Sequence, residues 1–168
     1  PDPKASLPPP TRAPKRLPGF TATRQPIRRV LDLCAGAGSA SAAVKILYPD
    51  ADVVSIDVSP RHNPTIQADI TKLARDKTRL DALAAEGFDL VWASPQCAEY
   101  SVANKAAGEP DKERSDDLVR ACLTVIAAVQ PTYWILENPE SGLPRRPVVA
   151  PLDAYRHRTS YCRYGFPY

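Results

Sequence analysis

The chain has 168 residues, 43% of them hydrophobic, which supports one hydrophobic core rather than two. No run of about 18 apolar residues is present and no apolar segment follows the basic residues near the N-terminus, so we expect no membrane span and no export signal. The formal charge of +3 is uneven, because residues 1–30 hold +6 and the rest −3. This distribution suits a polyanion such as nucleic acid and, equally well, a solvated linker.

The first 28 residues are predicted to be a flexible basic arm. They hold eight of the nineteen prolines and have no hydrophobic period. We expect one domain over residues 29–168. The protein is predicted to be intracellular, in the nucleus of a eukaryote or in the cytoplasm for a prokaryote or phage.

Short apolar runs alternate with helical patterns from Arg29 onward. In chain order we predict a strand at 30–34, a helix at 39–48, strands at 52–57 and 65–68, a helix at 77–86, a strand at 88–93, a helix at 116–130 and a strand at 133–137. Residues 141–168 have a weak pattern that suggests only a short strand near 160–164. The alternation predicts an α/β fold, a mostly parallel sheet with helices on both faces, and ligands bound beyond the carboxyl ends of the strands.

Three acids follow the first three predicted strands. In "VLDLCAGAGS", Asp32 precedes a turn with Gly36 and Gly38, where the backbone can approach a ligand, although such a turn equally serves tight packing. Asp57 could accept both hydroxyls of a ribose, or could simply cap a turn. Asp69 could receive an adenine amino group.

A cysteine and a glutamate follow the next two strands. In "VWASPQCAEYS", Pro95 ends the strand and places Cys97 in a loop, where a thiol can act as a nucleophile if a neighbour activates it. Cys122, inside an apolar helix, is typical of a buried structural thiol. In "YWILENPES", the strand is expected to bury Trp134, Ile135 and Leu136 and then to present Glu137, where burial favours the protonated acid; capping of a neighbouring helix is the alternative.

The cysteines and histidines do not indicate a metal site. Cys34, Cys97, Cys122 and Cys162 include no Cys-x-x-Cys pair, and His62 and His157 are not spaced to complete a zinc site. We therefore expect free thiols and no bound metal.

A thiol, an acid and an adenosine site suit addition to an electron-poor ring followed by group transfer. A thiolate that adds to carbon 6 of cytosine makes carbon 5 nucleophilic, and a glutamic acid at ring nitrogen 3 stabilises the developing charge. A sulfonium methyl can then be attacked, and in duplex DNA the base must first be flipped out.

These motifs resemble those of the cytosine-5 DNA methyltransferases, in particular the small phage-like or mobile-element members. "DLCAGAGS" is similar to the family's cofactor loop, "SPQC" to its Pro-Pro-Cys loop and "LENP" to its Leu-Glu-Asn-Val strand end. The resemblance implies a Rossmann-like class I S-adenosylmethionine-dependent fold with Cys97 as nucleophile, Glu137 as the acid, and Pro95 and Asn138 shaping the pocket. It also implies that the S-adenosylmethionine site is formed by Asp32, Cys34, Ala35, Gly36, Gly38, Asp57, Val58, Asp69, Ile70, Ser94 and Leu118.

The sequence also departs from the family pattern. Cys34 replaces a phenylalanine that packs on adenine, Gln96 replaces the second proline, and Ser39 replaces the last glycine. The chain stops at Tyr168, before the family's target-recognition region. The expectation is a domain of a longer polypeptide, with DNA as partner and weak or no activity on its own.

Three alternatives remain open. An amino-group methyltransferase acting on adenine or cytosine has a related motif at the same strand end, but with an aromatic residue where this chain has Cys97. An RNA cytosine could replace the DNA cytosine, because the thiol chemistry is the same. The fold could also survive as a catalytically silent nucleic-acid-binding or partner-binding module.

Overall fold

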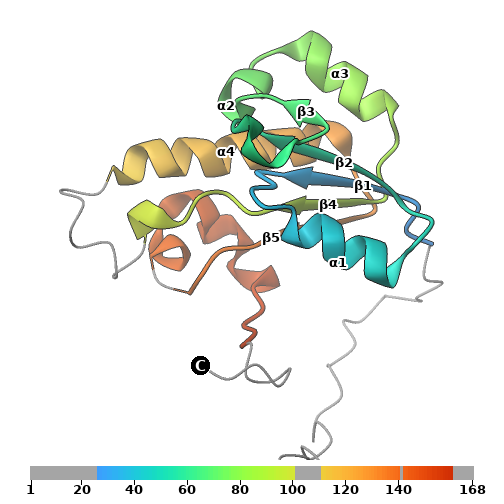
Figure 1. The fold of residues 1–168 in the computed structure, drawn as a ribbon. Coiled ribbons are helices and arrows are strands. Elements are labelled where there is room, and N and C mark those ends of the chain that lie inside the picture. The colour runs from blue at the N-terminus through green and yellow to red at the C-terminus, as the bar shows by residue number, and fades with distance from the viewer. Residues whose placement is uncertain (1–25, 101–110, 141, 161–168) are drawn as a thin grey trace, which may run out of the picture.

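Among the residues that the structure describes, five parallel strands form one sheet, and Figure 1 shows how they are arranged. The structure is a computed structural model that describes residues 26–100, 111–140 and 142–160. The strands are β1 Arg29–Leu33, β2 Asp52–Asp57, β3 Ile66–Gln67, β4 Leu90–Ala93 and β5 Tyr133–Leu136. Their order is β3-β2-β1-β4-β5, so the strand order reverses between β1 and β4. This arrangement confirms the predicted parallel α/β fold and brings the carboxyl ends of the strands to one edge.

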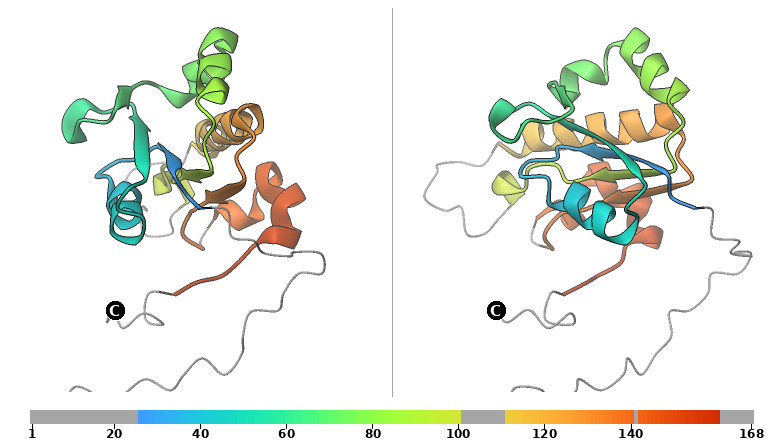
Figure 2. Two further views of the ribbon diagram at one scale, coloured as in Figure 1. Left: turned by 90° about the vertical axis from the view of Figure 1, so that its right-hand side faces the viewer. Right: turned by 45° about the vertical axis from the view of Figure 1, so that its right-hand side comes forward.

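Helices cover both faces of the sheet. They are α1 Ser39–Leu47, α2 Ile70–Leu73, α3 Lys77–Ala85 and α4 Lys112–Val129. On one face Val44 of α1 shares a buried cluster with Val30 and Leu90. On the other face α2, α3 and α4 bury Leu31 and Val91. Figure 2 shows α1 and α4 on opposite sides of the sheet, as the sequence predicted.

The central strand β1 is buried on both faces. Val30, Leu31 and Leu33 have no exposed area. A parallel strand with helices on each side needs a nearly continuous apolar run, and "VLDL" supplies one in which Asp32 is the polar exception. Burying a carboxylate in the middle of the sheet costs free energy unless the group has hydrogen-bond partners. The position of Asp32 therefore makes it a candidate functional residue.

The helix α4 begins at Lys112, earlier than the predicted start at 116. Asp111 caps it, because its side chain accepts a hydrogen bond from the Arg114 N–H at 3.0 Å. The first turn is polar and has no apolar period, which is why the pattern indicated a later start. Its end is as predicted: Gln130 takes a left-handed conformation before Pro131.

The strand β4 begins at Leu90, two residues later than predicted, and the other main differences involve short elements. The third strand has two residues instead of four, and α2 was not predicted because four residues carry no period. The 3₁₀ segments are η1 Pro60–His62, η2 Ala98–Tyr100, η3 Leu143–Arg145 and η4 Pro147–Tyr155. Leu143 and Val149 pack with Val119 of α4, so η3 and η4 lie beside that helix. Residue 160 is not in a strand, and the rest of the strand suggested near 160–164, like the arm up to residue 25, lies outside the described residues.

The expectation that β5 buries its apolar residues is wrong for two of them. Trp134 is 38% exposed and Ile135 is 41% exposed. Within the described residues β5 pairs only with β4, so it is an edge strand. Successive side chains of a strand point to opposite faces, and at this edge Trp134 and Ile135 lie on the two faces with incomplete cover. Leu136 is half-buried against both neighbouring clusters.

Candidate active site

Cys97 lies in the loop that leaves β4, as the sequence predicted. Pro95 is buried and Cys97 is half-buried, so the thiol is outside the fully packed core. The chain then forms η2, in which the Tyr100 N–H donates to the Cys97 carbonyl at 3.0 Å. This turn holds the backbone of Cys97 from its C-terminal side.

Glu137 and Asn138 follow β5 beside the Cys97 loop. The Glu137 N–H donates to the Ala93 carbonyl at 2.8 Å, which continues the β4–β5 pairing by one residue. Asn138 Nδ2 donates to the Pro95 carbonyl at 2.8 Å. This bond joins the two loops directly. A half-buried thiol and a half-buried carboxyl group therefore come from adjacent strands at the same edge of the sheet.

The turn after β1 requires its glycines. Gly36 and Gly38 have φ values of 50° and 76°, in the left-handed region that other residues rarely adopt. Among the described residues beyond each glycine and its chain neighbours, no atom lies within 4 Å of a Cβ built on either glycine, so the space beside them is open. The Ala35 N–H donates to the Ile56 carbonyl at 3.1 Å and fixes the turn against β2.

Asp57, at the end of β2, contacts the same turn. Its Oδ2 accepts from the Gly36 N–H at 2.8 Å and its Oδ1 from the Ser59 N–H at 2.8 Å. A carboxylate has about four acceptor positions, so it can accept further hydrogen bonds. The neighbouring Val58 is 65% exposed, which is unusual for an apolar residue beside a buried sheet.

Asp32 is 1% exposed and is held by the first turn of α1. Its Oδ2 accepts from the Ser41 N–H at 3.1 Å and from the Ser41 hydroxyl at 2.6 Å. Burial raises the pKa of Asp32, although the hydrogen bonds from Ser41 oppose that shift. Its Oδ1 is buried and has no hydrogen-bond partner among the described residues.

Asp69 acts as the N-cap of α2. Its Oδ1 accepts from the Thr71 hydroxyl at 2.7 Å and the Thr71 N–H at 2.9 Å, and the hydroxyl bond is the main cause of a lowered pKa of Asp69. The Ala68 N–H donates to the Asp57 carbonyl at 2.9 Å, so Asp69 lies near the end of β2. Sequence reasoning assigned Asp69 to the cofactor and did not foresee the cap.

The remaining predicted cofactor residues include Ser94 after β4 and three residues of the core cluster. The Ser94 N–H donates to the Leu33 carbonyl at 3.1 Å, and the Ser94 hydroxyl accepts from Trp92 Nε1 at 2.6 Å. Ile70 is buried, and Leu118 and Cys34 are partly buried residues packed against the same core cluster. The structure thus places Asp32, Asp57 and Ser94 at the ends of β1, β2 and β4, whereas Ile70 of α2 and Leu118 of α4 belong to or pack against the main core.

The thiol of Cys34 faces the interior. Its Sγ lies 3.9 Å from Sγ of Cys122, which is buried in α4. The hydrogen bond with Cys122, followed by burial, raises the pKa of the Cys34 thiol. A protonated thiol is a poor nucleophile, so of the three described free cysteines Cys97 is the best placed to react.

Sequence reasoning missed a buried polar cluster next to the Cys97 loop. The Tyr100 hydroxyl donates to Asp116 Oδ1 at 2.7 Å, and Arg146 donates to both Asp116 oxygens at 2.7–3.1 Å. These residues are far apart in the sequence, and no local pattern signals their contact.

The described residues contain neither a membrane-spanning helix nor a metal-binding cluster. No helix in this part of the chain has the length and apolar character needed to cross a bilayer. Nor does it hold any group of three or more His, Cys, Asp or Glu side chains able to bind a metal ion.

Comparison with known proteins identifies relatives of this chain. Residues 28–143 match the family described as C-5 cytosine-specific DNA methylase. The chain is 33% identical, over an alignment 66 residues long, to the "Probable DNA (cytosine-5)-methyltransferase" of Frog virus 3 (isolate Goorha). That match covers 33% of this chain and 31% of the viral protein, so the chain aligns with less than a third of that relative's length.

Proposed function

Because the chain belongs to the family of C-5 cytosine-specific DNA methylases, we propose that it transfers a methyl group from S-adenosylmethionine to carbon 5 of cytosine in DNA. The observation that carries this proposal is the hydrogen bond from Asn138 to the Pro95 carbonyl. It couples the loop of Cys97 to the loop of Glu137, the two groups that must act on one base.

In the proposed reaction, Cys97 and Glu137 act on a flipped-out cytosine. The thiolate of Cys97 adds to carbon 6, and the ring electrons shift toward carbon 5 and nitrogen 3. A hydrogen bond between the carboxyl group of Glu137 and nitrogen 3 stabilises that charge. After carbon 5 has gained the methyl group, it loses its proton, and those electrons re-form the ring double bond as the Cys97–carbon 6 bond breaks.

Pro95 and Asn138 have supporting roles in this proposal. The buried Pro95 limits the conformations of the loop, and its carbonyl receives the Asn138 amide. Asn138 Oδ1 is buried with no hydrogen-bond partner among the described residues, so it can accept a hydrogen bond from a bound base. The two residues would therefore fix the distance between the nucleophile and the acid.

The edge formed by β1 and β2 fits S-adenosylmethionine. Asp57 has free acceptor capacity for ribose hydroxyls, Asp32 keeps a buried oxygen for which the described residues offer no partner, and the space beside Gly36 is open. The cofactor supplies an electrophilic methyl group. We propose that Asp69 receives the adenine amino group through its second oxygen, and that the pocket is lined by Cys34, Ala35, Gly38, Val58, Ile70, Ser94 and Leu118.

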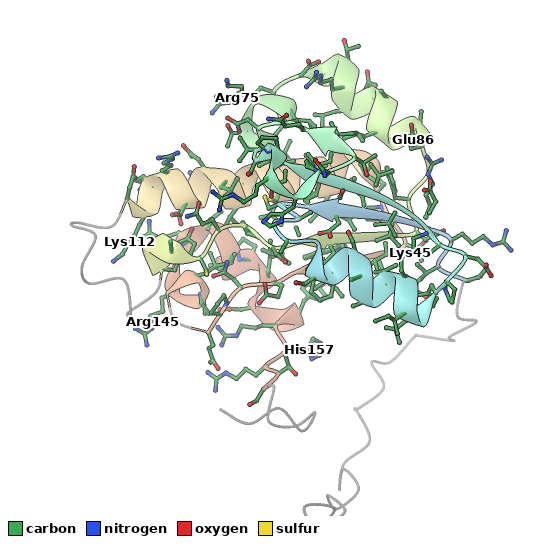
Figure 3. The ribbon with its side chains drawn as sticks, viewed as in Figure 1. Lys45, Arg75, Glu86, Lys112, Arg145 and His157 are labelled. Carbon is green, nitrogen blue, oxygen red and sulfur yellow. The ribbon has the colours of Figure 1, made fainter. Side chains whose placement is uncertain are left out.

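Residues 29–168 would form the methyltransferase domain, and the basic arm over 1–28 would contact the DNA backbone. Exposed cations of the domain support DNA as the substrate: Figure 3 shows Lys112 and Arg145 on the side where the strands end, whereas Lys45 lies toward the opposite side. Cations beside the reacting loops can pair with phosphates on either side of a flipped base.

A mechanism-based trap tests the proposal. The trap uses the longest natural polypeptide that contains this chain, because the chain alone is expected to have weak activity. DNA with 5-fluorocytosine, incubated with that polypeptide and S-adenosylmethionine, should form a stable adduct, because fluorine at carbon 5 cannot leave as a proton does. Mass spectrometry should map the adduct to Cys97, and Cys97→Ser should abolish it, whereas DNA with ordinary cytosine should leave none.

Each other outcome would contradict a specific part of the proposal. An adduct that persists in Cys97→Ser would refute the nucleophile, and an adduct on RNA but not on DNA would refute the substrate. A methyl group on an exocyclic nitrogen would indicate the amino-group reaction. No adduct at all would favour a silent module of the same fold.

A further inference from the structure

The loop that carries Cys97 is fixed at both ends by different contacts. At its start, the Pro95 carbonyl accepts from Asn138 at 2.8 Å. At its end, Tyr100 is 3% exposed, and its N–H donates back to the Cys97 carbonyl. The position of Tyr100 therefore determines where the peptide of Cys97 lies.

The Tyr100 side chain is held from one direction by Asp116. The phenol donates to Asp116 Oδ1 at 2.7 Å, and Asp116 is only 2% exposed. A carboxylate at this depth needs a counterion, and Arg146 provides it with Nε at 3.0 Å and Nη2 at 2.7 Å from Asp116 Oδ2. Burial by itself would raise the pKa of Asp116, but hydrogen bonds from Arg146 and Tyr100 outweigh it, so the pKa is lowered and the carboxylate stays charged.

The Tyr100 backbone is held from the other direction by Gly142. A Cβ built on Gly142 would lie 2.7 Å from the Tyr100 carbonyl oxygen and 3.0 Å from its Cα. Only glycine permits this approach, because real Cβ atoms essentially never come so close. Gly142 follows Glu137 and Asn138 in the chain, so the segment that leaves the candidate acid packs directly on the turn that follows the candidate nucleophile.

We propose that Tyr100 and Asp116 are positioning residues, which hold the Cys97 loop at a fixed place relative to Glu137. Arg146 serves as the counterion that keeps Asp116 charged in the interior. The inference rests on the proposed function, because it assumes that Cys97 and Glu137 act on the same base. The proposal adds Tyr100, Asp116 and Arg146 to the residues of the proposed function, as residues that act through the Cys97 loop and not by contact with the base or the cofactor.

Positioning has a signature that general stabilisation lacks. If the Tyr100 hydroxyl only contributed to stability, its loss would loosen the fold everywhere and expose every thiol. If it positions the loop, its loss should free Cys97 alone. The thiol would then react faster with a small alkylating agent but slower with a cytosine that needs one orientation.

The experiment uses the full chain with Tyr100→Phe and Asp116→Asn. Tyr48→Phe is the matched control, because Tyr48 lies at the far end of α1 and is 39% exposed. Alkylation by iodoacetamide is followed at Cys34, Cys97 and Cys122 by mass spectrometry. Adduct formation with 5-fluorocytosine DNA is measured at saturating DNA, together with the Kd for DNA.

We expect Tyr100→Phe to slow adduct formation by about tenfold to a hundredfold with the Kd within about twofold of wild type, since small misplacements of a reacting group have effects of that order. Alkylation of Cys97 should accelerate while that of Cys34 and Cys122 stays unchanged. Asp116→Asn should act in the same direction, and the two substitutions together should have less than the product of their separate effects.

Two results would overturn the proposal. One is a set of rates for Tyr100→Phe equal to those of Tyr48→Phe. The other is acceleration at Cys122 in parallel with Cys97, since that indicates global loosening. If the longest natural polypeptide that contains the wild-type chain forms no adduct, the proposed function fails, while the alkylation of Cys97 in the chain still decides whether Tyr100 and Asp116 hold the loop.

Discussion

Asp57 is the residue that best tests the cofactor site. It is half-buried at the end of β2, and it already accepts hydrogen bonds from Gly36 and Ser59. Hydrogen bonds to a charged acceptor contribute about 1.5–3 kcal/mol each, so loss of the charge should weaken binding of a ribose. We expect Asp57→Asn to raise the Kd for S-adenosylmethionine about tenfold or more, as measured by isothermal titration calorimetry.

Asp81→Asn is the control for that measurement. Asp81 is an exposed carboxylate on α3 that pairs with Lys77, away from the turn after β1. The same chemical change there should leave the Kd unaltered. Equal Kd values for wild type and Asp57→Asn, with thermal unfolding unchanged, would remove Asp57 from the cofactor site.

Single residues of the site could be predicted only where a strand end marks them. Cys97 and Glu137 were found because each follows an apolar run and parallel strands end at one edge. Asp116 and Arg146 could not be found, because their contact joins a helix to a segment 30 residues away and neither lies at a strand end. The functional roles of all the site residues stay predictions.

The strand β2 contributes one fully buried side chain, Ile56, to the main core. Ile56 is 1% exposed and belongs to the main core cluster, whereas Ile46 on α1 is 79% exposed. Removing a buried isoleucine side chain costs about 2–5 kcal/mol, since packing is reduced and a cavity remains. We therefore expect Ile56→Ala to lower the midpoint of thermal unfolding by on the order of 10 °C.

The identical substitution at Ile46 provides the comparison. Exposed positions away from special contacts change the free energy of unfolding by about 0.5 kcal/mol or less. Ile46→Ala should therefore unfold within a few degrees of wild type, followed by circular dichroism at 222 nm. Similar destabilisation by both changes would show that the exposed end of α1 is covered in solution.

The strands and helices with a clear sequence signal could be predicted, whereas the short and irregular elements could not. β2 was predicted with its observed bounds because an apolar run lies between Asp52 and Asp57, and α3 within one residue because Gly87 marks its end. The elements α2, η3 and η4 have no comparable signal in the sequence. Their form depends on contacts with α4 and on the cap at Asp69, which belong to tertiary structure.

At the scale of the whole molecule, the charge is distributed unevenly, with a basic N-terminal segment and an acidic remainder. Residues 1–30 hold a charge of +6, and the remaining residues hold −3. An acidic domain repels a DNA backbone unless local cations offset it. The proposed role of the arm is therefore electrostatic, and an electrostatic role can be recognised by its salt dependence.

Neutralising the arm should reduce that dependence. The variant replaces with glutamine the five basic residues of the first 25 positions: Lys4, Arg12, Lys15, Arg16 and Arg24. For duplex DNA, each cation removed from a phosphate reduces the slope of log K against log salt by about 0.9. We expect a slope smaller by up to about 4 and an affinity decrease that is greater at low salt, measured by fluorescence anisotropy with one DNA duplex.

The control must change the net charge equally without touching the arm. It neutralises five exposed cations of η1, α2, α3 and the link between these helices: Arg61, Lys72, Arg75, Lys77 and Arg79. If the arm contacts phosphates, this variant keeps a slope near that of wild type, because counterion release depends on contacts and only weakly on total charge. Equal decreases in both variants would point to net charge alone, and unchanged binding in the arm variant would show that residues 1–25 act as a solvated linker.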